Sequence, residues 1–405
     1  MISSNKLPAG WQIKSIGSFS KVTTGATPLR AKHDRYFTGG TIPWIKTTDL
    51  NNSDIVDCEE KITELAVKEN SCSVLPKDTV LVAMYGGFRQ IGRTGILRIP
   101  AATNQALSAI RVDKKEAMPY FLLHYLNENV SQWKRLAASS RKDPNITRQD
   151  VLDYEVVLPP LEQQEKIVAV ATTWDEAIAL QNRQLQQLRR RKKEVAFRLL
   201  IKQERINGFN EDWEKYQLGD YFDRLTTRNA LGNTNVLTIS AQQGLVSQTK
   251  YFNKSIASEE VSNYFLLSRG DFAYNKSYSA GYPMGVIKPL TEYDHGIVSP
   301  LYICLRPTTE DAEFFEHYFE AGMLNQGISR IAQEGARNHG LLNVSSRDFM
   351  ELDTIVPPAA ERRAIADMLN TADAEIRLNE RKLEALREQK SGLLYKLLTG
   401  EILLS

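Results

Sequence analysis

The chain has 405 residues, 42% of them hydrophobic and 25% charged, which is typical of a globular protein with two or three domains. Its formal net charge is only +2, so nucleic-acid binding has to come from local basic patches and not from overall charge. The apolar stretches are short and interrupted and the first residues are polar, so we expect no membrane span and no signal peptide. The three cysteines, Cys58, Cys72 and Cys304, are too far apart for a zinc pattern and fit a reducing cytoplasm.

Residues 1–157 are expected to form a first globular domain of mixed α/β structure. Runs rich in Val, Ile, Leu and Thr predict strands at 79–84, 92–99 and 107–112. Pro119 then opens a helical pattern that continues to about residue 137.

Residues 158–205 are predicted to form one long helix. Pro159-Pro160 marks its start, Glu162 lies in the first turn where the helix dipole favours an acid, and Asn207-Gly208 marks its end. At about 1.5 Å per residue the helix is roughly 60 Å long, which is more than one small core requires.

Residues 206–355 repeat the first domain loosely, and residues 356–405 repeat the long helix closely. The helical segments match without a gap at an offset of 198 residues, from Pro159 to Pro357. The globular segments share weaker matches: Trp11 with Trp213, Gly17 with Gly219, Asp78 with Asp271, His124 with His317, and Asn145-Ile146-Thr147 with Asn343-Val344-Ser345. A duplicated unit is expected to place two similar surfaces around a pseudo-twofold axis, which suits a ligand with two half-sites, such as DNA.

Both long helices carry the same apolar stripe with steps of three and four residues, which is typical of a coiled coil. Its apolar positions are Ile167, Val170, Trp174, Ile178, Leu185 and Leu188 in the first helix and Ile365, Met368, Ile376, Leu383, Leu386 and Leu393 in the second. Its polar positions, which can fix register, are Gln181, Lys192, Asn379 and Lys390. The simplest arrangement pairs the helices antiparallel within the chain; the alternative is that each helix packs on its own domain. The predicted fold class is therefore α+β, with two pseudo-twofold-related α/β domains separated by an intramolecular antiparallel coiled coil.

No catalytic motif is present in the sequence. It has no GxxxxGK[ST] phosphate loop, no GxGxxG turn in a βαβ unit and no metal-nuclease pattern. The two Pro-Pro pairs lack the flanking Asn or Asp and aromatic residue with which an amino-methyltransferase holds a flipped base. His124 and His317 lie in helical patterns beside aromatic residues and are predicted to pack there. We expect no catalytic residue and no metal site.

Each half has loops in which basic, amide and aromatic residues gather, and these are the candidate DNA-binding segments. Arg and Asn or Gln pair with base edges, whereas Lys and Ser more often hold phosphates. The candidates are Lys46, Thr47, Thr48, Tyr85, Arg89, Arg93, Ser139, Arg141 and Lys142 in the first half, and Gln242, Asn275, Lys276, Tyr278, Tyr282, Arg330, Arg337 and Asn338 in the second. The alternative for each loop is a solvated surface turn. The basic run at 189–193 is either a solvated face of the coiled coil or a contact with DNA or an acidic partner.

With these features the chain resembles the specificity (S) subunits of Type I restriction-modification systems over essentially its whole length. The resemblance rests on the order globular–helix–globular–helix, on the Leu158-Pro159-Pro160 and Val356-Pro357-Pro358 helix starts, and on the ending Lys396-Leu397-Leu398-Thr399-Gly400-Glu401-Ile402. The segments Gly40-Thr41-Ile42-Pro43-Trp44-Ile45-Lys46 and Asn343-Val344-Ser345 also resemble the family. The first helix departs from the pattern because it lacks the terminal Gly.

The resemblance implies that 1–157 and 206–355 are two target recognition domains, each reading half of a bipartite, asymmetric DNA target. It implies that 158–205 and 356–405 are conserved spacer helices that set the distance between half-sites and dock two methyltransferase (M) subunits. The partner subunits would bind S-adenosylmethionine, ATP and Mg, and this chain would bind none of them. Restriction (R) subunits would complete an adenine-N6 methyltransferase and ATP-dependent endonuclease in a prokaryotic cytoplasm, with this chain as its non-catalytic part.

Three alternatives remain open from the sequence. In the first alternative, the chain is a paired-domain adaptor that binds proteins instead of DNA. In the second alternative, it is the S subunit of a system that only modifies DNA. The third alternative is a nuclease or self-contained methyltransferase, which the missing motifs argue against.

Overall fold

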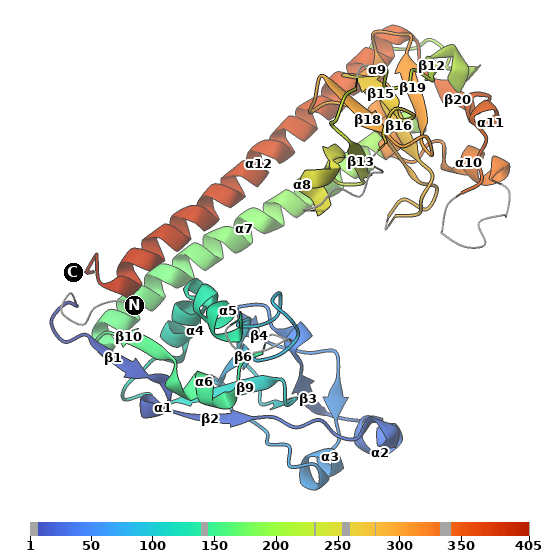
Figure 1. Ribbon diagram of the computed structural model, residues 1–405. Helices are drawn as coiled ribbons and strands as arrows, with labels where there is room; N and C mark the ends of the chain where they lie inside the picture. Colours follow the sequence, from blue (N-terminus) through green and yellow to red (C-terminus); the bar gives the residue numbers. More distant parts are fainter. Residues whose placement is uncertain are drawn as a thin grey trace. The chain divides into compact units, whose positions relative to one another are not determined.

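The computed structural model describes residues 7–138, 145–230, 232–252, 260–279, 281–332 and 342–404 (Figure 1). The chain divides into two compact units, Met1–Asn182 with Arg381–Ser405, and Arg183–Glu380. Each unit holds one globular domain and part of both long helices, α7 (Leu161–Leu200) and α12 (Ala359–Thr399).

The first domain is built on a five-stranded sheet with the order β2-β9-β6-β7-β4. Neighbouring strands are antiparallel except β4 and β7, which are parallel. The strands are β2 (Ser20–Thr24), β9 (Leu107–Val112), β6 (Val80–Ala83), β7 (Thr94–Leu97) and β4 (Asp54–Ile55). The three strands expected from the sequence are therefore present as β6, β7 and β9, and all residues of β6 and β7 are buried.

Smaller elements complete the first domain. A three-stranded sheet, β5-β3-β8, packs with two short helices around the buried Trp44. The elements are β3 (Ile42–Ile45), β5 (Lys61–Ile62), β8 (Ala102–Thr103), α2 (His33–Tyr36) and α3 (Glu64–Glu69). The main core lies between one face of the five-stranded sheet and the helices α1 (Ile16–Phe19), α4 (Pro119–Glu128), α5 (Val130–Ala138) and α6 (Arg148–Asp153).

The helix expected at 119–137 is two helices, because the chain leaves helical geometry at Asn129. Its φ and ψ are −106° and 23°, and its backbone N–H and side-chain amide both donate to the Tyr125 carbonyl, at 3.1 and 2.8 Å. The side chain thus caps α4, as Asn commonly does at a helix end.

The second domain repeats this arrangement around the sheet β12-β19-β16-β17, in which all neighbours are antiparallel. Two further two-stranded antiparallel sheets, the hairpin β13-β14 and the pair β15-β18, complete the domain. The strands are β12 (Phe222–Leu225), β13 (Leu237–Ser240), β14 (Gly244–Ser247), β15 (Phe265–Ser268), β16 (Phe272–Asn275), β17 (Val286–Pro289), β18 (His295–Val298) and β19 (Ile303–Pro307). The helices are α8 (Gln248–Phe252), α9 (Ala312–Glu320), α10 (Asn325–Ile331) and α11 (Ser346–Met350).

The strand register shows which residues of the two sheets correspond. Val80 lies opposite Ile110, which lies opposite Val22. Phe272 in the same way lies opposite Leu305, which lies opposite Arg224. By this register Asp78 corresponds to Gly270 and not to Asp271. Asp78 and Gly270 also share a positive φ, of 67° and 91° respectively.

A strand pair leads into each long helix. β1 (Gln12–Ser15) pairs antiparallel with β10 (Glu155–Leu158), and β11 (Glu214–Gln217) pairs in the same way with β20 (Asp353–Val356). Each helix begins at the residue directly after its Pro-Pro pair, as expected because proline is tolerated at a helix start, where its missing N–H would have no partner within the helix.

In both units the start of one long helix lies beside the end of the other, so the helices pair antiparallel. In the first unit Lys390 of α12 donates to Asp175 of α7 at 2.6 Å. In the second unit Lys192 of α7 donates to both carboxylate oxygens of Asp373 of α12, each at 2.6 Å. These ion pairs are equivalent under the 198-residue offset.

The seam between the helices is close to the expected stripe, with one correction. Ile167, Leu185, Ile365, Ile376 and Leu383 are buried. A second group is half-buried: Val170, Trp174, Ile178, Leu188, Leu386 and Leu393. Met368 was wrongly assigned, because it is 46% exposed while Leu369 is 1% exposed and packs in the core of the second domain. The first turns of α12 face that domain as well as α7, which shifts the buried stripe by one residue.

Two buried histidines join these ion pairs to the globular domains. His124 of α4 has Nδ1 3.9 Å from the Asp175 carboxylate, and His317 of α9 has Nδ1 3.9 Å from that of Asp373. Burial lowers the pKa of His124 to about 4 and also lowers that of His317, so both rings are neutral at pH 7. They pack in the domain cores, as expected.

The basic run at 189–193 is largely neutralised within the second unit. Arg189 pairs with Glu380 at 2.6 Å, Arg190 with Glu194 at 2.8 Å, and Lys192 with Asp373. The solvated coiled-coil face is therefore the better of its two interpretations.

We expect Lys192→Asp to lower the free energy of unfolding of the second unit by about 1–3 kcal/mol, because it sets two carboxylates against each other in a half-buried place. The exchange Lys192→Asp with Asp373→Lys should recover most of that loss. Urea unfolding followed by circular dichroism measures both effects. A double variant no more stable than the weaker single variant would show that this pair does not stabilise the helices.

Candidate DNA interface

One end of each central sheet carries one of the candidate loops. Because β2, β9, β6 and β7 alternate in direction, the loop from β6 to β7 projects from the end where β2 finishes and β9 starts. The loop from β16 to β17 projects from the same end of the second sheet, where β12 finishes and β19 starts. We call these positions the loop ends of the two sheets.

A second segment returns to each loop end. The Ile146 N–H donates to the Met84 carbonyl at 3.0 Å in the first domain, and the Leu342 N–H donates to the Lys276 carbonyl at 3.0 Å in the second. The spacing of Asn-(Ile/Val)-(Thr/Ser) and a following Asp, which both domains share, has a local cause here. Thr147 and Ser345 are the N-caps of α6 and α11, and their hydroxyls accept from the backbone N–H of Asp150 and of Asp348.

In the first domain the β6–β7 loop presents free polar groups. Tyr85 is 42% exposed and Arg89 is exposed, with no ion pair to any residue that the structure describes. Gly86 and Gly87 have φ values of 110° and 76°, which only glycine adopts easily. Arg93 donates to the Gln90 side chain at 3.0 Å and is less available.

The Lys46 segment is engaged within the first domain. The Lys46 ammonium lies 2.7 Å from Glu60, which Arg30 also binds. These hydrogen bonds lower the pKa of Glu60 to about 2, so the pair is charged at neutral pH. Thr47 and Thr48 form a 3-10 turn, Thr47–Asp49, in which Asp49 accepts from the Lys46 N–H at 2.7 Å. Sequence reasoning missed this pairing because Glu60 is distant along the chain.

In the second domain Tyr278 is 67% exposed on the β16–β17 loop, and Lys276 is half-buried at its base. Asn275 accepts from the Ser277 N–H at 3.1 Å. Tyr282 donates to Glu320 and approaches the Ala241 carbonyl at 3.4 Å, so it links this loop to the turn that carries the exposed Gln242.

The remaining candidates divide into two groups. Arg330 is exposed on α10 and forms no ion pair with a residue that the structure describes. Five candidates lie outside the described residues: Ser139, Arg141, Lys142, Arg337 and Asn338.

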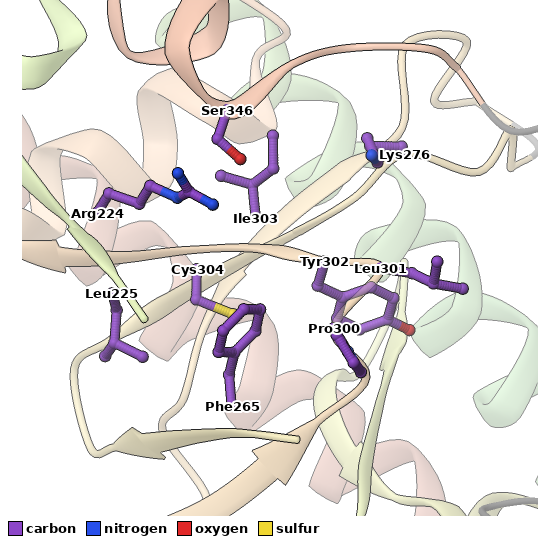
Figure 2. Close-up of a pocket in the computed structure, with 10 residues that line it drawn as sticks. All are labelled: Arg224, Leu225, Phe265, Lys276, Pro300, Leu301, Tyr302, Ile303, Cys304 and Ser346. Carbon is purple, nitrogen blue, oxygen red and sulfur yellow. The ribbon is translucent and has the colours of Figure 1, made fainter. Parts of the chain in front are cut away.

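A hollow of about 60 Å³ lies at the loop end of the second sheet (Figure 2). Arg224, Lys276 and Ser346 supply its polar lining, and Tyr302, Ile303 and Cys304 are among the others. Sequence reasoning named Lys276 but missed Arg224 and Ser346. Only the pairing of β12 with β19 and the position of α11 bring these two residues together, and no sequence pattern marks them.

The described part of the chain contains no group of three or more His, Cys, Asp or Glu side chains placed to bind a metal ion. None of its helices is long and apolar enough to cross a membrane.

Comparison with known proteins finds similarity to one family. Residues 8–190 match the family described as Type I restriction modification DNA specificity domain. The chain is 30% identical over 182 residues to the Type I restriction enzyme MjaIX specificity subunit of Methanocaldococcus jannaschii. That alignment covers 44% of this chain and 41% of the relative, so it spans less than half of the relative's length.

Two further similarities extend over nearly the whole chain. The putative Type I restriction enzyme MjaX specificity subunit of the same organism is 22% identical, over 98% of this chain and 95% of that protein. A crystal structure of a Type I restriction-modification S subunit from M. genitalium has the same fold, with a TM-score of 0.54, 14% identity and 98% coverage of both chains. Residues 8–190 thus match the Type I specificity domain, and over nearly its whole length the chain is similar to Type I restriction-modification specificity subunits.

Proposed function

We propose that this chain is the non-catalytic DNA-recognition subunit of a Type I restriction-modification complex, and that each globular domain reads one half of a bipartite, asymmetric target. The observation that carries the proposal is the duplicated sheet, with exposed loops of different sequence at the same end. Equal architecture with unequal loops suits two half-sites of unequal sequence.

The loop ends offer the chemistry that base recognition requires. The exposed Arg89 guanidinium can pair bidentately with guanine, and the exposed Tyr85 and Tyr278 can donate or accept at base edges or phosphates. Lys46 is the weaker candidate, because its charge is already paired with Glu60.

The long helices are proposed to set the distance between the half-sites and to dock two M subunits. Their 40 and 41 residues carry exposed apolar side chains at positions that match under the 198-residue offset. Leu180 and Leu378 are each 59% exposed, and Phe197 and Tyr395 are also exposed. Identical exposed positions on both helices are expected if two copies of one partner bind.

The partner subunits are proposed to supply the chemistry. M subunits would bind S-adenosylmethionine and methylate adenine, and R subunits would use ATP and Mg for cleavage. The complex would act in the cytoplasm of a prokaryotic cell.

Methylome sequencing of cells that express the M subunits with and without this chain tests the proposal. A split adenine-methylation motif should appear only when the chain is present. Arg89→Ala should relax or remove one half of the motif and leave the other half unchanged, because Arg89 lies on the first domain alone. The same methylation pattern without the chain would contradict the proposed function.

A further inference from the structure

The hollow at the loop end of the second sheet is lined by two basic side chains and a hydroxyl. It lies where β12 ends beside the start of β19, and Lys276, the first residue of the β16–β17 loop, lies at the same end. Figure 2 shows the Arg224 guanidinium and the Ser346 hydroxyl on the same side of the sheet, with Lys276 at the other end of the hollow.

Both cations of the hollow lack a carboxylate partner among the residues that the structure describes, whereas three other basic residues of the same domain have one. Arg306 binds Asp271 at 2.7 Å, Lys288 binds Glu320, and Arg269 binds Asp294 at 3.0 Å. Arg224 has only Asp223 beside it in β12, and alternation along a strand directs that side chain to the opposite face. Burial lowers the pKa of the Lys276 ammonium, as expected of a half-buried cation without a counter-charge.

The first domain places a cation at the corresponding point from a different element. Arg224 corresponds to Val22 by strand register, and Ser346 corresponds to Arg148, since each is the first residue of its helix. The Arg148 guanidinium donates to the Val22 carbonyl at 3.0 Å and, within the described ranges, has no carboxylate partner. A positive charge is thus kept at one position of the fold although the residue that supplies it has changed.

We propose that Arg224 and Lys276, with the Ser346 hydroxyl, bind a phosphate of the DNA backbone, and that Arg148 binds one at the corresponding place in the first domain. The inference rests on the proposed function and adds that these residues hold the backbone and do not read bases. Two cations without carboxylate partners and a hydroxyl, placed at the two ends of a small hollow, suit the oxygens of a backbone phosphate, which accept several charge-assisted hydrogen bonds.

The test is the affinity of the assembled complex of this chain with its M subunits for fluorescent duplexes, measured by anisotropy over a series of NaCl concentrations. One duplex carries the cognate target and one carries scrambled half-sites. The variants are Arg224→Gln, Lys276→Gln and Arg148→Gln. Arg269→Gln is the matched control, because it removes one charge from the same domain at the opposite end of the sheet.

We expect each of the three variants to weaken binding about tenfold at low salt, by the same factor for both duplexes. The slope of log affinity against log salt should fall by about 0.9 for each lost phosphate contact. The control should leave the slope unchanged, and Arg224→Lys should retain it because the charge is kept. Thermal unfolding of each variant separates these effects from misfolding.

An unchanged salt slope in all three variants would overturn the inference alone. A loss confined to the cognate duplex would overturn it too, because the residues would then read bases. Failure of the variants to assemble with M subunits would assign the hollow to an acidic side chain of the partner protein. If the unmodified complex bound neither duplex, the proposed function itself would fail, and the inference with it.

Discussion

Inserting four residues into both long helices should lengthen the spacer of the recognised DNA target by one or two base pairs and leave both half-sites unchanged. The insertion points are between Asn182 and Arg183 in α7 and between Glu380 and Arg381 in α12, where the two compact units divide. Four helical residues add about 6 Å, against about 3.4 Å for each base-pair step. They also add about 40° beyond a full helical turn, which is close to the twist between adjacent base pairs.

The paired helices should accept this change. Insertion at matched levels keeps the pairs Lys390–Asp175 and Lys192–Asp373 within their own units. A four-residue insertion in a heptad pattern only unwinds the coiled coil locally. Methylome sequencing measures the new spacing, with a variant in which residues 183–186 are replaced by alanine at unchanged length as the control. If the longer chain kept the original spacing, the helices would not act as the ruler.

The long helices and the central strands could be predicted from the sequence because their signals are local or repeated. The offset of 198 residues identified both helices and made Asp175 equivalent to Asp373 and Lys192 equivalent to Lys390. The structure joins these four residues in two equivalent ion pairs, Lys390–Asp175 and Lys192–Asp373. The stripe failed at Met368, where tertiary packing on the second domain buries Leu369 instead. Periodicity cannot show which of two adjacent residues faces a neighbouring domain.

The candidate interface could be predicted only in part. Loops rich in Gly, Arg and Tyr mark the β6–β7 and β16–β17 hairpins, but the sequence does not show which side chains are already engaged. Lys46 pairs with Glu60 and Tyr282 with Glu320, both far along the chain. Arg224 was missed for the converse reason. It lies in a short strand, and only the register with β19 brings it to the loop end.

Replacing Arg362 with alanine should lower the free energy of unfolding of the second unit by about 3–5 kcal/mol, because it leaves a buried carboxylate without its partner. Arg362 and Asp311 are 7% and 6% exposed and form an ion pair. The guanidinium also donates to the Pro357 carbonyl at 2.9 Å and lies 4.9 Å from the ring centre of Tyr221. It therefore ties the first turn of α12 to the domain that precedes it.

The first repeat shows that a neutral side chain can also connect the first turn of the long helix to the domain before it. Gln164, which corresponds to Arg362, is fully buried, accepts from the Met118 N–H at 2.8 Å and donates to the Glu116 and Pro159 carbonyls at 3.0 and 2.8 Å. Arg362→Gln combined with Asp311→Asn removes both charges and should therefore cost much less than Arg362→Ala.

The ion pair also predicts how stability depends on pH. Burial alone would raise the pKa of Asp311, but the hydrogen bond from Arg362 and the charge of Arg362 outweigh it and leave the pKa below its usual value of 3.8. A lowered carboxylate pKa stabilises the folded state above the unfolded pKa, and this stabilisation is lost as the pH falls through the folded value. The unmodified chain should thus lose this contribution below about pH 4, whereas the neutral double variant should not. Denaturant unfolding at pH 3 to 7 measures the difference, and parallel pH profiles for the two chains would show that the Arg362–Asp311 pair contributes no net stability.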